Sequence, residues 1–278
     1  MHLTSARRNK LSASTISKHA VLVALSFLAI FPLYWMIVTS LKSEGEIFNA
    51  SLLPHHWTFD HYKMAWDSIP MARMLGNSIG VSLLQTICQV VTSILAAYAF
   101  TRWDFRGSSL IYGLIGLTWL VPFQVIMIPN YVVISNFGWR DTLTGLIVPN
   151  IVSAFAVMQL YNAFKSFPKA LIEAARLDGA SDWSILWRTV FPNLKASIAS
   201  IGILLFITSW NDYFWPLLVT TKMEHSTIQK GLQMFMSSEM NLWGPLMAAT
   251  TIASLPVLIL YLLLQRQIID SFVKGGLR

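Results

Sequence analysis

Residues 20–40 read AVLVALSFLAIFPLYWMIVTS, a stretch in which no side chain carries a charge. A helix rises about 1.5 Å per residue, so about 20 apolar residues cross a hydrocarbon core of about 30 Å. The stretch therefore predicts a membrane-spanning helix. Its basic flank would also suit a secretory signal peptide, but the apolar run is long and ends near Tyr34 and Trp35, which are typical interface anchors. We expect an anchor that stays in the protein.

The composition extends this interpretation to the whole chain. Of the 278 residues 55% are hydrophobic and only 12% are charged, whereas a soluble domain has about 25% charged residues. The net charge of +7 would suggest a nucleic-acid partner in a soluble protein. In a membrane protein, Lys and Arg on cytoplasmic loops explain it, so no nucleic acid is expected. The one cysteine, Cys88, cannot form an intrachain disulfide.

Long apolar stretches recur five more times, which predicts an all-α integral membrane protein with six transmembrane helices. Fourteen of the 20 Lys and Arg residues fall on the side that holds both chain ends, so the positive-inside rule places both termini in the cytoplasm. We expect a cytoplasmic segment at 1–19, a six-helix transmembrane domain at 20–265 and a cytoplasmic tail at 266–278. The predicted spans are 20–40, 76–100, 109–129, 143–163, 198–220 and 245–265.

The loop at 164–197, between the fourth and fifth predicted spans, is long and lacks the composition of a flexible linker. Its sequence predicts two short helices, at 169–178 and 181–190. Gly179 lies between them and can adopt a positive φ, which permits a sharp turn. Pro192 is expected to end the second helix before the chain enters the membrane again.

The first of these helices carries Ala174 and Ala175, which expose little side chain and would let another protein approach the backbone. By helical spacing the residues that share a face are Leu171, Ala174, Ala175 and Asp178. The alternative is an amphipathic helix lying on the lipid surface. The apolar residues that favour this alternative are Trp183, Leu186, Trp187 and Val190. Spacing alone does not decide between protein docking and lipid binding.

Residues 173–181 read EAARLDGAS, and the run 173–192 resembles the EAA loop of ABC importer permeases. The amino-acid sequence of this run is similar to that of the carbohydrate-type permeases in particular. Other segments similar to that family are Ser40-Leu41-Lys42 with Glu46-Ile47-Phe48, Pro122-Phe123-Gln124 with Pro129, residues 210–217 and residues 273–276. The resemblance covers nearly the whole chain and fits best the smaller of two paired permeases, the maltose-permease G type.

The resemblance implies an inner-membrane subunit that translocates a carbohydrate, either a sugar, an oligosaccharide or a polyol phosphate, and is not itself an enzyme. It implies as partners a second homologous permease, two ATP-binding cassette ATPases and an extracytoplasmic solute-binding protein. The residues that would contact the ATPase are Glu173, Ala174, Ala175, Asp178, Gly179, Ala180 and Pro192. Two alternatives remain: an ABC permease for a non-sugar solute, and an ATP-independent secondary carrier.

The sequence contains no Gly-x-x-x-x-Gly-Lys-Ser/Thr motif, the loop that cradles nucleotide phosphates. We therefore expect no bound cofactor in this chain, with ATP bound by the partner ATPase. No metal site is expected either, because His55, His56 and His61 lack the His-x-x-x-His spacing of a helical metal pair.

The fifth predicted span contains Asp212, the one acidic residue placed inside the membrane. A central Asp costs about 2.5–3.5 kcal/mol on insertion scales, so its side chain should face the bundle interior. Pro216 has no N–H, so we expect a kink that frees the Asp212 carbonyl, with Asn211 supplying amide donors. The candidate residues of a translocation path are Asn211, Asp212, Tyr213 and Trp215. The alternative is a structural role, in which Asp212 caps a broken helix and the aromatic rings anchor at the outer interface.

Overall fold

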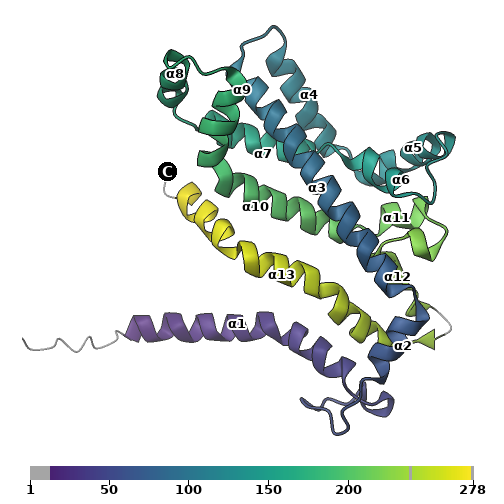
Figure 1. Cartoon of the computed structure of the whole chain (residues 1–278). Helices are drawn as coiled ribbons and strands as arrows, with labels where there is room; N and C mark the ends of the chain where they lie inside the picture. The colour runs from purple at the N-terminus through teal and green to yellow at the C-terminus, as the bar shows by residue number, and fades with distance from the viewer. Residues whose placement is uncertain (1–12, 238–239, 277–278) are drawn as a thin grey trace, which may run out of the picture.

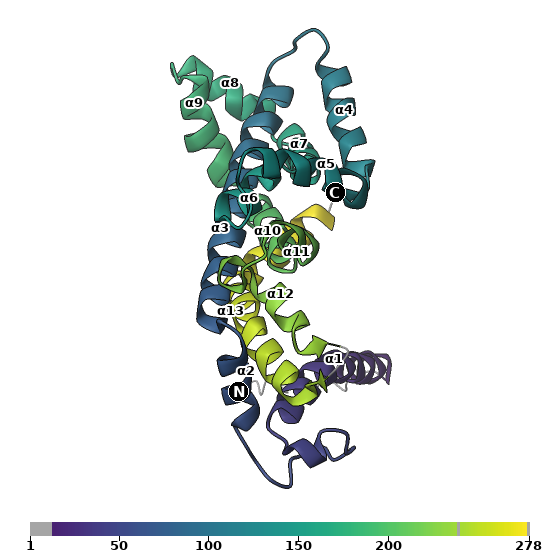
Figure 2. The same cartoon turned by 90° about the vertical axis from the view of Figure 1, so that its right-hand side faces the viewer.

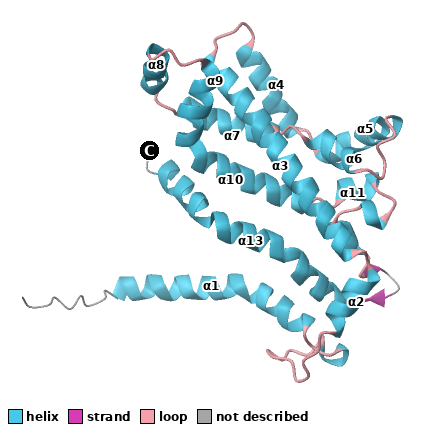
Figure 3. Ribbon diagram, in the orientation of Figure 1, coloured by secondary structure: helices cyan, strands magenta, loops and turns pink. Residues whose placement is uncertain are grey.

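The computed structural model describes residues 13–237 and 240–276. Within these residues the only regular structure besides helices is a pair of two-residue strands, so the predicted all-α class is confirmed (Figure 3). Parts of the predicted end segments 1–19 and 266–278 lie outside the described residues. The long helices are α1 (Ala13–Ser40), α3 (Met71–Arg102), α10 (Phe191–Trp210) and α13 (Trp243–Gly276).

The shorter elements fall between these helices. The short α-helices are α2 (Asp60–Ser68), α4 (Ser108–Leu120), α5 (Phe123–Asn136), α6 (Leu143–Ile147), α7 (Ala154–Lys165), α8 (Lys169–Leu177), α9 (Asp182–Ser184), α11 (Phe214–Val219) and α12 (Ile228–Gln233). The remaining elements are the 3-10 turns η1 (Glu44–Glu46), η2 (Val148–Asn150) and η4 (Met223–His225), the π-helix η3 (Ile185–Val190), and the strands β1 (Met236–Ser237) and β2 (Met240–Asn241).

The helices pack side by side in an order that differs from the order along the chain. α1 packs on α13, α13 on α10, α10 on α3, α3 on α7, and α7 on α4 (Figures 1 and 2). α1 lies at one margin, and only 6% of its most apolar window is buried in the chain. A helix that is apolar all round and so little covered requires lipid or another protein around it.

Four helices are long and apolar enough to cross a membrane unbroken, and two bent pairs bring the number of candidate spans to six. The unbroken spans are Ser17–Ser40, Met71–Arg102, Asp182–Trp210 and Trp243–Gln267. Three of the predicted spans differ from the structure. The stretches predicted at 109–129 and 143–163 are each broken, and the fifth span begins and ends earlier than the predicted 198–220.

Prolines and a serine cap explain the two breaks. Between α4 and α5 the chain turns by 97°, where Val121 is extended (ψ 118°) before Pro122, as the residue preceding a proline prefers. Between η2 and α7 the bend is 44°. There Pro149 lies in η2 and the Ser153 hydroxyl accepts the Ala156 N–H, which starts a new helix.

Figure 1 shows two ends of the bundle. The start of α1, the end of α13, α8 and α9 lie on its left, and α2, α5, α6, α11 and α12 lie on its right. Asp141 joins segments at the second end, because its carboxylate accepts the N–H groups of Thr221 and Lys222 and the Thr221 hydroxyl. The hydroxyl contact first, and the two N–H groups with it, lower the pKa of Asp141 to about 2. The carboxylate is therefore charged at any physiological pH.

Gly145 is packed too closely for any side chain. A Cβ at this position would lie 2.2 Å from the Trp139 carbonyl oxygen, a main-chain atom that cannot turn away. We expect Gly145→Ala to lose about 1–3 kcal/mol of stability through overpacking and to unfold several degrees lower in detergent. Gly113→Ala is the matched control, because nothing lies within 4 Å of its added Cβ. Equal thermal midpoints for the two variants would contradict this account of the α5–α6 corner.

Candidate functional site: an exposed helix and a polar cavity

The helix α8 is bounded by a proline and a glycine. Pro168 precedes it, and Gly179 follows it at φ +77°, a conformation that favours glycine. The Gly179 N–H donates to the Arg176 carbonyl and the Ala180 N–H to the Ala175 carbonyl, each at 3.0 Å. This pair of bonds is a Schellman motif, which satisfies the last carbonyls of the helix. The predicted sharp turn at Gly179 is confirmed.

The two sides of α8 have different surroundings. Ile172 and Ala175 pack against the buried apolar cluster that includes Leu186. On the other side Leu177 is 90% exposed, and Ala174 is exposed beside it. Ala175 therefore lies partly against the chain itself, and the face predicted from spacing is only partly free. The predicted contact residues that are exposed are Glu173, Ala174, Asp178 and Gly179.

Two of the four apolar residues after Gly179 are buried within the protein. Leu186 and Val190 are each 1% exposed, so they belong to the protein core. Trp187 is half-buried, with its ring tilted against that of Phe191, while Trp183 is 63% exposed. The lipid-surface alternative therefore loses two of the four apolar residues on which it depended.

Pro192 does not end a helix, contrary to the prediction. α9, η3 and α10 run on as one candidate span, Asp182–Trp210, and Pro192 lies in the first turn of α10. Before it, the Phe191 N–H donates to the Leu186 carbonyl five residues back, in a π turn. The wider turn accommodates the proline ring, which in a regular α-helix would clash with the carbonyl four residues earlier. Ala180 is half-buried against the same core.

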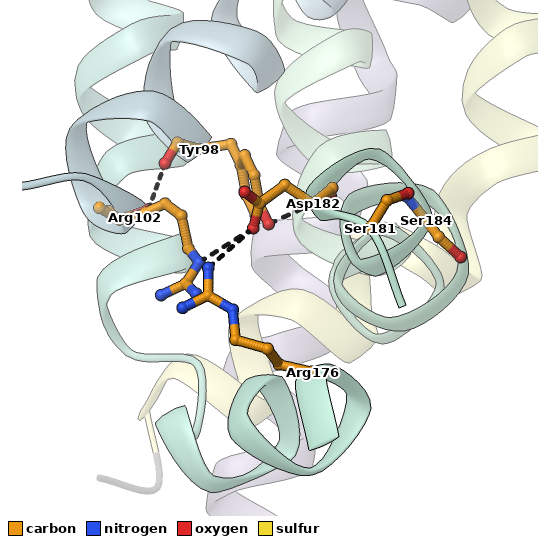
Figure 4. Close-up of polar contacts among 7 residues, drawn as sticks. Tyr98, Arg102, Arg176, Ser181, Asp182 and Ser184 are labelled. Carbon is orange, nitrogen blue, oxygen red and sulfur yellow. Dashed lines mark hydrogen bonds and ion pairs between the residues drawn. The ribbon is translucent and has the colours of Figure 1, made fainter. Parts of the chain in front are cut away.

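Asp182 ties α8 to α3. Its carboxylate Oδ1 accepts from the Arg102 Nε of α3 at 3.4 Å and from an Arg176 Nη of α8 at 3.2 Å. Its carbonyl oxygen accepts the Tyr98 hydroxyl at 3.2 Å. Figure 4 shows both guanidinium groups converging on this one carboxylate. The sequence analysis did not identify Asp182 or its partners, because nothing in the sequence places residue 102 beside residue 182.

We expect Asp182→Ala to loosen α8 from α3 without preventing insertion. The carboxylate side chain is 36% exposed, so solvent screens the pair and each contact contributes at most about 1 kcal/mol. We therefore expect the Asp182→Ala variant to transport two- to fivefold more slowly while the amount of protein in the membrane stays normal. Asp104→Ala, on the exposed loop beside Arg102, is the control. An effect no larger than that of the control would mean that the tie has no part in coupling.

The fifth span breaks where the sequence predicted a disturbance. α10 ends at Trp210, residues 211–213 are not helical, and α11 begins at Phe214. The Asp212 carboxylate Oδ1 accepts the Trp215 N–H at 3.3 Å and so caps α11. Pro216 lies in the first turn of α11, where its missing N–H leaves no bond unmade. The predicted kink is therefore a full break, and the cap predicted as the alternative role of Asp212 is present.

A cavity of about 550 Å³ lies beside this break and is bordered by α3, α4, α7 and α10. Its lining is largely apolar but includes amide groups: the side-chain nitrogens of Gln85 and Gln89 donate to the carbonyls of Leu146 and Asn150 at 2.9 and 2.6 Å. The lining residues are Gln85, Gln89, Trp119, Phe123, Asn150, Ser153, Phe155, Leu204, Leu205, Thr208, Ser209 and Asp212. Hydroxyl and amide groups beside aromatic rings are chemically suited to a polyhydroxylated solute.

Of the four predicted path residues, Asp212 alone lines this cavity. Trp215 is fully buried and donates its indole N–H to the Gly145 carbonyl at 3.0 Å. Asn211 is exposed and accepts from Gln229 instead of donating to Asp212, and Tyr213 meets Phe214 edge to face. The aromatic cluster around the break is therefore largely structural.

The residues that sequence analysis missed are Gln85 and Gln89. They lie four apart on α3, so they share one face of that helix. That spacing was the available signal, since uncharged polar residues inside a span mark an interior or water-filled face.

Comparison with known proteins identifies relatives over almost the full length. The family model of the binding-protein-dependent transport system inner membrane component matches residues 89–274. The diacetylchitobiose uptake system permease protein NgcG of Streptomyces coelicolor is 32% identical, over 94% of this chain and 88% of its own. The lactose transport system permease protein LacG of Rhizobium radiobacter is 29% identical, over 94% of both chains. The sn-glycerol-3-phosphate transport system permease protein UgpE of Yersinia pestis is 32% identical, over 92% and 95%.

Among solved structures, a chain of a bacterial ABC transporter that imports the acidic polysaccharide alginate has the same fold. The TM-score is 0.78 over 95% of this chain and 99% of that one, at 22% identity.

Proposed function

This chain belongs to the family of binding-protein-dependent transport system inner membrane components, and from that membership we propose that it is the permease subunit of an ABC importer for a carbohydrate. The observation that carries the proposal is α8. It is a nine-residue helix outside the spans, with Leu177 90% exposed and its end fixed at Gly179. An exposed apolar side chain on a rigid short helix suits insertion into a groove of another protein.

The partner at α8 is a separate ATPase. The sequence has no phosphate-binding loop, so the energy for uptake must come from another subunit. Glu173, Ala174, Asp178 and Gly179 form the exposed contact side, and Ala175 and Ala180 seat the helix on its own chain. Pro192 contributes indirectly, through the π turn that joins the α8 region to α10.

The contacts of α8 suggest how its movement reaches the spans. When ATP binding closes the ATPase pair, α8 moves with it. The Arg176–Asp182–Arg102 tie transmits that movement to α3, and the continuous helix from Asp182 transmits it to α10. Both helices border the polar cavity, so a rocking movement would open it to one side of the membrane and then to the other.

The cavity supports a carbohydrate as the solute. Trp119, Phe123 and Phe155 offer flat apolar faces, and the glutamines and hydroxyls offer hydrogen-bonding groups. Sugars present both kinds of surface. The printed names of the relatives describe uptake of diacetylchitobiose, lactose and arabino-oligosaccharides, as well as sn-glycerol-3-phosphate.

The remaining partners and the orientation follow from the same family. A second, homologous permease would complete the path, and an extracytoplasmic solute-binding protein would deliver the sugar to the end that holds α5, α6 and α11. α8 and both ends of the described chain would then face the cytoplasm. The excess of Lys and Arg on that side supports this orientation.

Reconstitution in proteoliposomes tests the proposed function. The chain alone should hydrolyse no ATP above background. The complete set of two permeases, two ATPases and a binding protein should accumulate labelled sugar only when ATP is present on the ATPase side. Sugar uptake by this chain alone without ATP would establish a secondary carrier and overturn the proposal.

A further inference from the structure

The described side chains that line the cavity beside Asp212 include an acidic group but no basic group. Among the described residues that line it, Asp212 is the one ionisable side chain and none is basic. The other polar lining residues are Gln85, Gln89, Asn150, Ser153, Thr208 and Ser209. An anionic group entering the cavity would lose hydration and meet no positive charge from these residues in return.

Part of the hydrogen-bonding capacity of the cavity is used within the chain. The side-chain amide nitrogens of Gln85, Gln89 and Asn150 each donate to a main-chain carbonyl. The Thr208 hydroxyl donates to the Leu204 carbonyl, and the Ser209 hydroxyl donates to Gln85. Each amide nitrogen has a second N–H, so neutral groups of the lining can still donate as well as accept, whereas the Asp212 carboxylate only accepts.

We propose that this cavity admits uncharged carbohydrates and rejects solutes that carry a phosphate or carboxylate group. The inference rests on the proposed function and specifies its substrate class. Sugar hydroxyls can donate hydrogen bonds to the Asp212 carboxylate and accept them from amide N–H groups, whereas ionised phosphates and carboxylates only accept. Asp212 adds like-charge repulsion at short range. This chain then differs in solute charge from the relative named for sn-glycerol-3-phosphate and from the alginate importer of the same fold.

Equilibrium binding to the purified complex of permeases and ATPases, prepared without the solute-binding protein, tests the proposal. Omitting the binding protein removes its own selectivity. The uncharged probes are lactose and N,N′-diacetylchitobiose, and the anionic probes are sn-glycerol-3-phosphate and an alginate trisaccharide. We expect the better uncharged probe to bind roughly a hundredfold more tightly than either anion, which corresponds to about 2.7 kcal/mol.

Asp212→Asn isolates the charge. Asparagine keeps an oxygen that can accept the Trp215 N–H, so the cap of α11 is retained while the negative charge is lost. We expect the preference for the uncharged probe to fall at least about tenfold, because the anions bind more tightly. Asp60→Asn, an exposed aspartate at the start of α2, is the matched control and should leave the preference unaltered.

Each outcome has a definite meaning. Anions that bind the unaltered complex as tightly as uncharged sugars would overturn the inference and leave the importer function standing. An unchanged preference in Asp212→Asn would also overturn it, because the carboxylate would then contribute nothing to selection. Binding of neither class would count against the carbohydrate function on which the inference rests.

Discussion

Gly179→Val should reduce sugar uptake on the order of tenfold while the protein still inserts in the membrane at normal levels. At φ +77° a β-branched side chain clashes with its own backbone, at a cost of about 1–3 kcal/mol. Nothing lies within 4 Å of an added Cβ, so the strain is conformational and not a matter of packing. Relief of the strain requires the Schellman turn to open, which displaces the C-terminal end of α8 from its position.

Uptake and ATP hydrolysis measured on the same proteoliposomes check this prediction. Hydrolysis should fall less than uptake, because the motor remains intact while its contact is disturbed. Gly179→Asn is the control, since asparagine tolerates a positive φ, and it should retain most of the uptake. Normal uptake by Gly179→Val would remove the turn from the coupling mechanism.

Asp212→Ala should reduce uptake by at least about tenfold, a second large effect. The change removes the cap of α11, worth about 0.5–2 kcal/mol, and the one carboxylate that lines the cavity. The first turn of α11 would then lose the side chain that fixes its start at the break. Initial rates of uptake in cells with matched expression are the measurement.

Two further variants separate the roles of Asp212. Asp60→Ala changes an exposed aspartate far from the cavity lining and should transport normally. Asp212→Asn keeps an oxygen for the Trp215 amide and should recover part of the lost uptake. Equal and negligible losses in Asp212→Ala and Asp60→Ala would show that neither the cap nor the carboxylate matters for transport.

The straight spans could be predicted because lipid imposes a simple rule on them. An uncharged run of sufficient length must form a helix that bonds its own backbone, and the runs that became α1, α3 and α13 obey it. The breaks at Pro122 and Ser153 could not be placed in the same way. Prolines are tolerated inside spans when neighbouring groups satisfy the backbone, so a proline alone does not distinguish a kink from a 97° bend.

The exposed helix was predicted in most detail because its signals are local. Gly179 and Pro168 mark the ends of α8 within a few residues of sequence. The partial burial of Ala175 and the place of Pro192 inside a continuous helix were not predicted, since they depend on the packing of the next helix, which includes Leu186 and Val190. The tie from Arg102 to Asp182 spans eighty positions, and no local pattern reveals it.

The lining of the cavity likewise depends on contacts between residues that are distant in the sequence. Asp212 was predicted because a carboxylate in a span is costly and therefore conspicuous. Gln85 and Gln89 are less costly, and their role depends on α3 meeting the carbonyls of Leu146 and Asn150. From the sequence, the aromatic residues near the break suggest a set of rings against which a sugar could pack. Trp215 instead fills the core beside Phe123.

The central claim is that α8 contacts an ATPase and not lipid. Cross-linking measures that contact. Ala174→Cys, in a Cys88→Ser background, places one thiol on the exposed side of α8. The assembled complex that contains this variant is incubated with a short bifunctional thiol reagent. We expect a cross-linked product of permease and ATPase, and we expect its yield to change when ATP is added. A thiol that forms no such product, and is modified instead by a lipid-soluble reagent, would contradict the account and place α8 on the membrane.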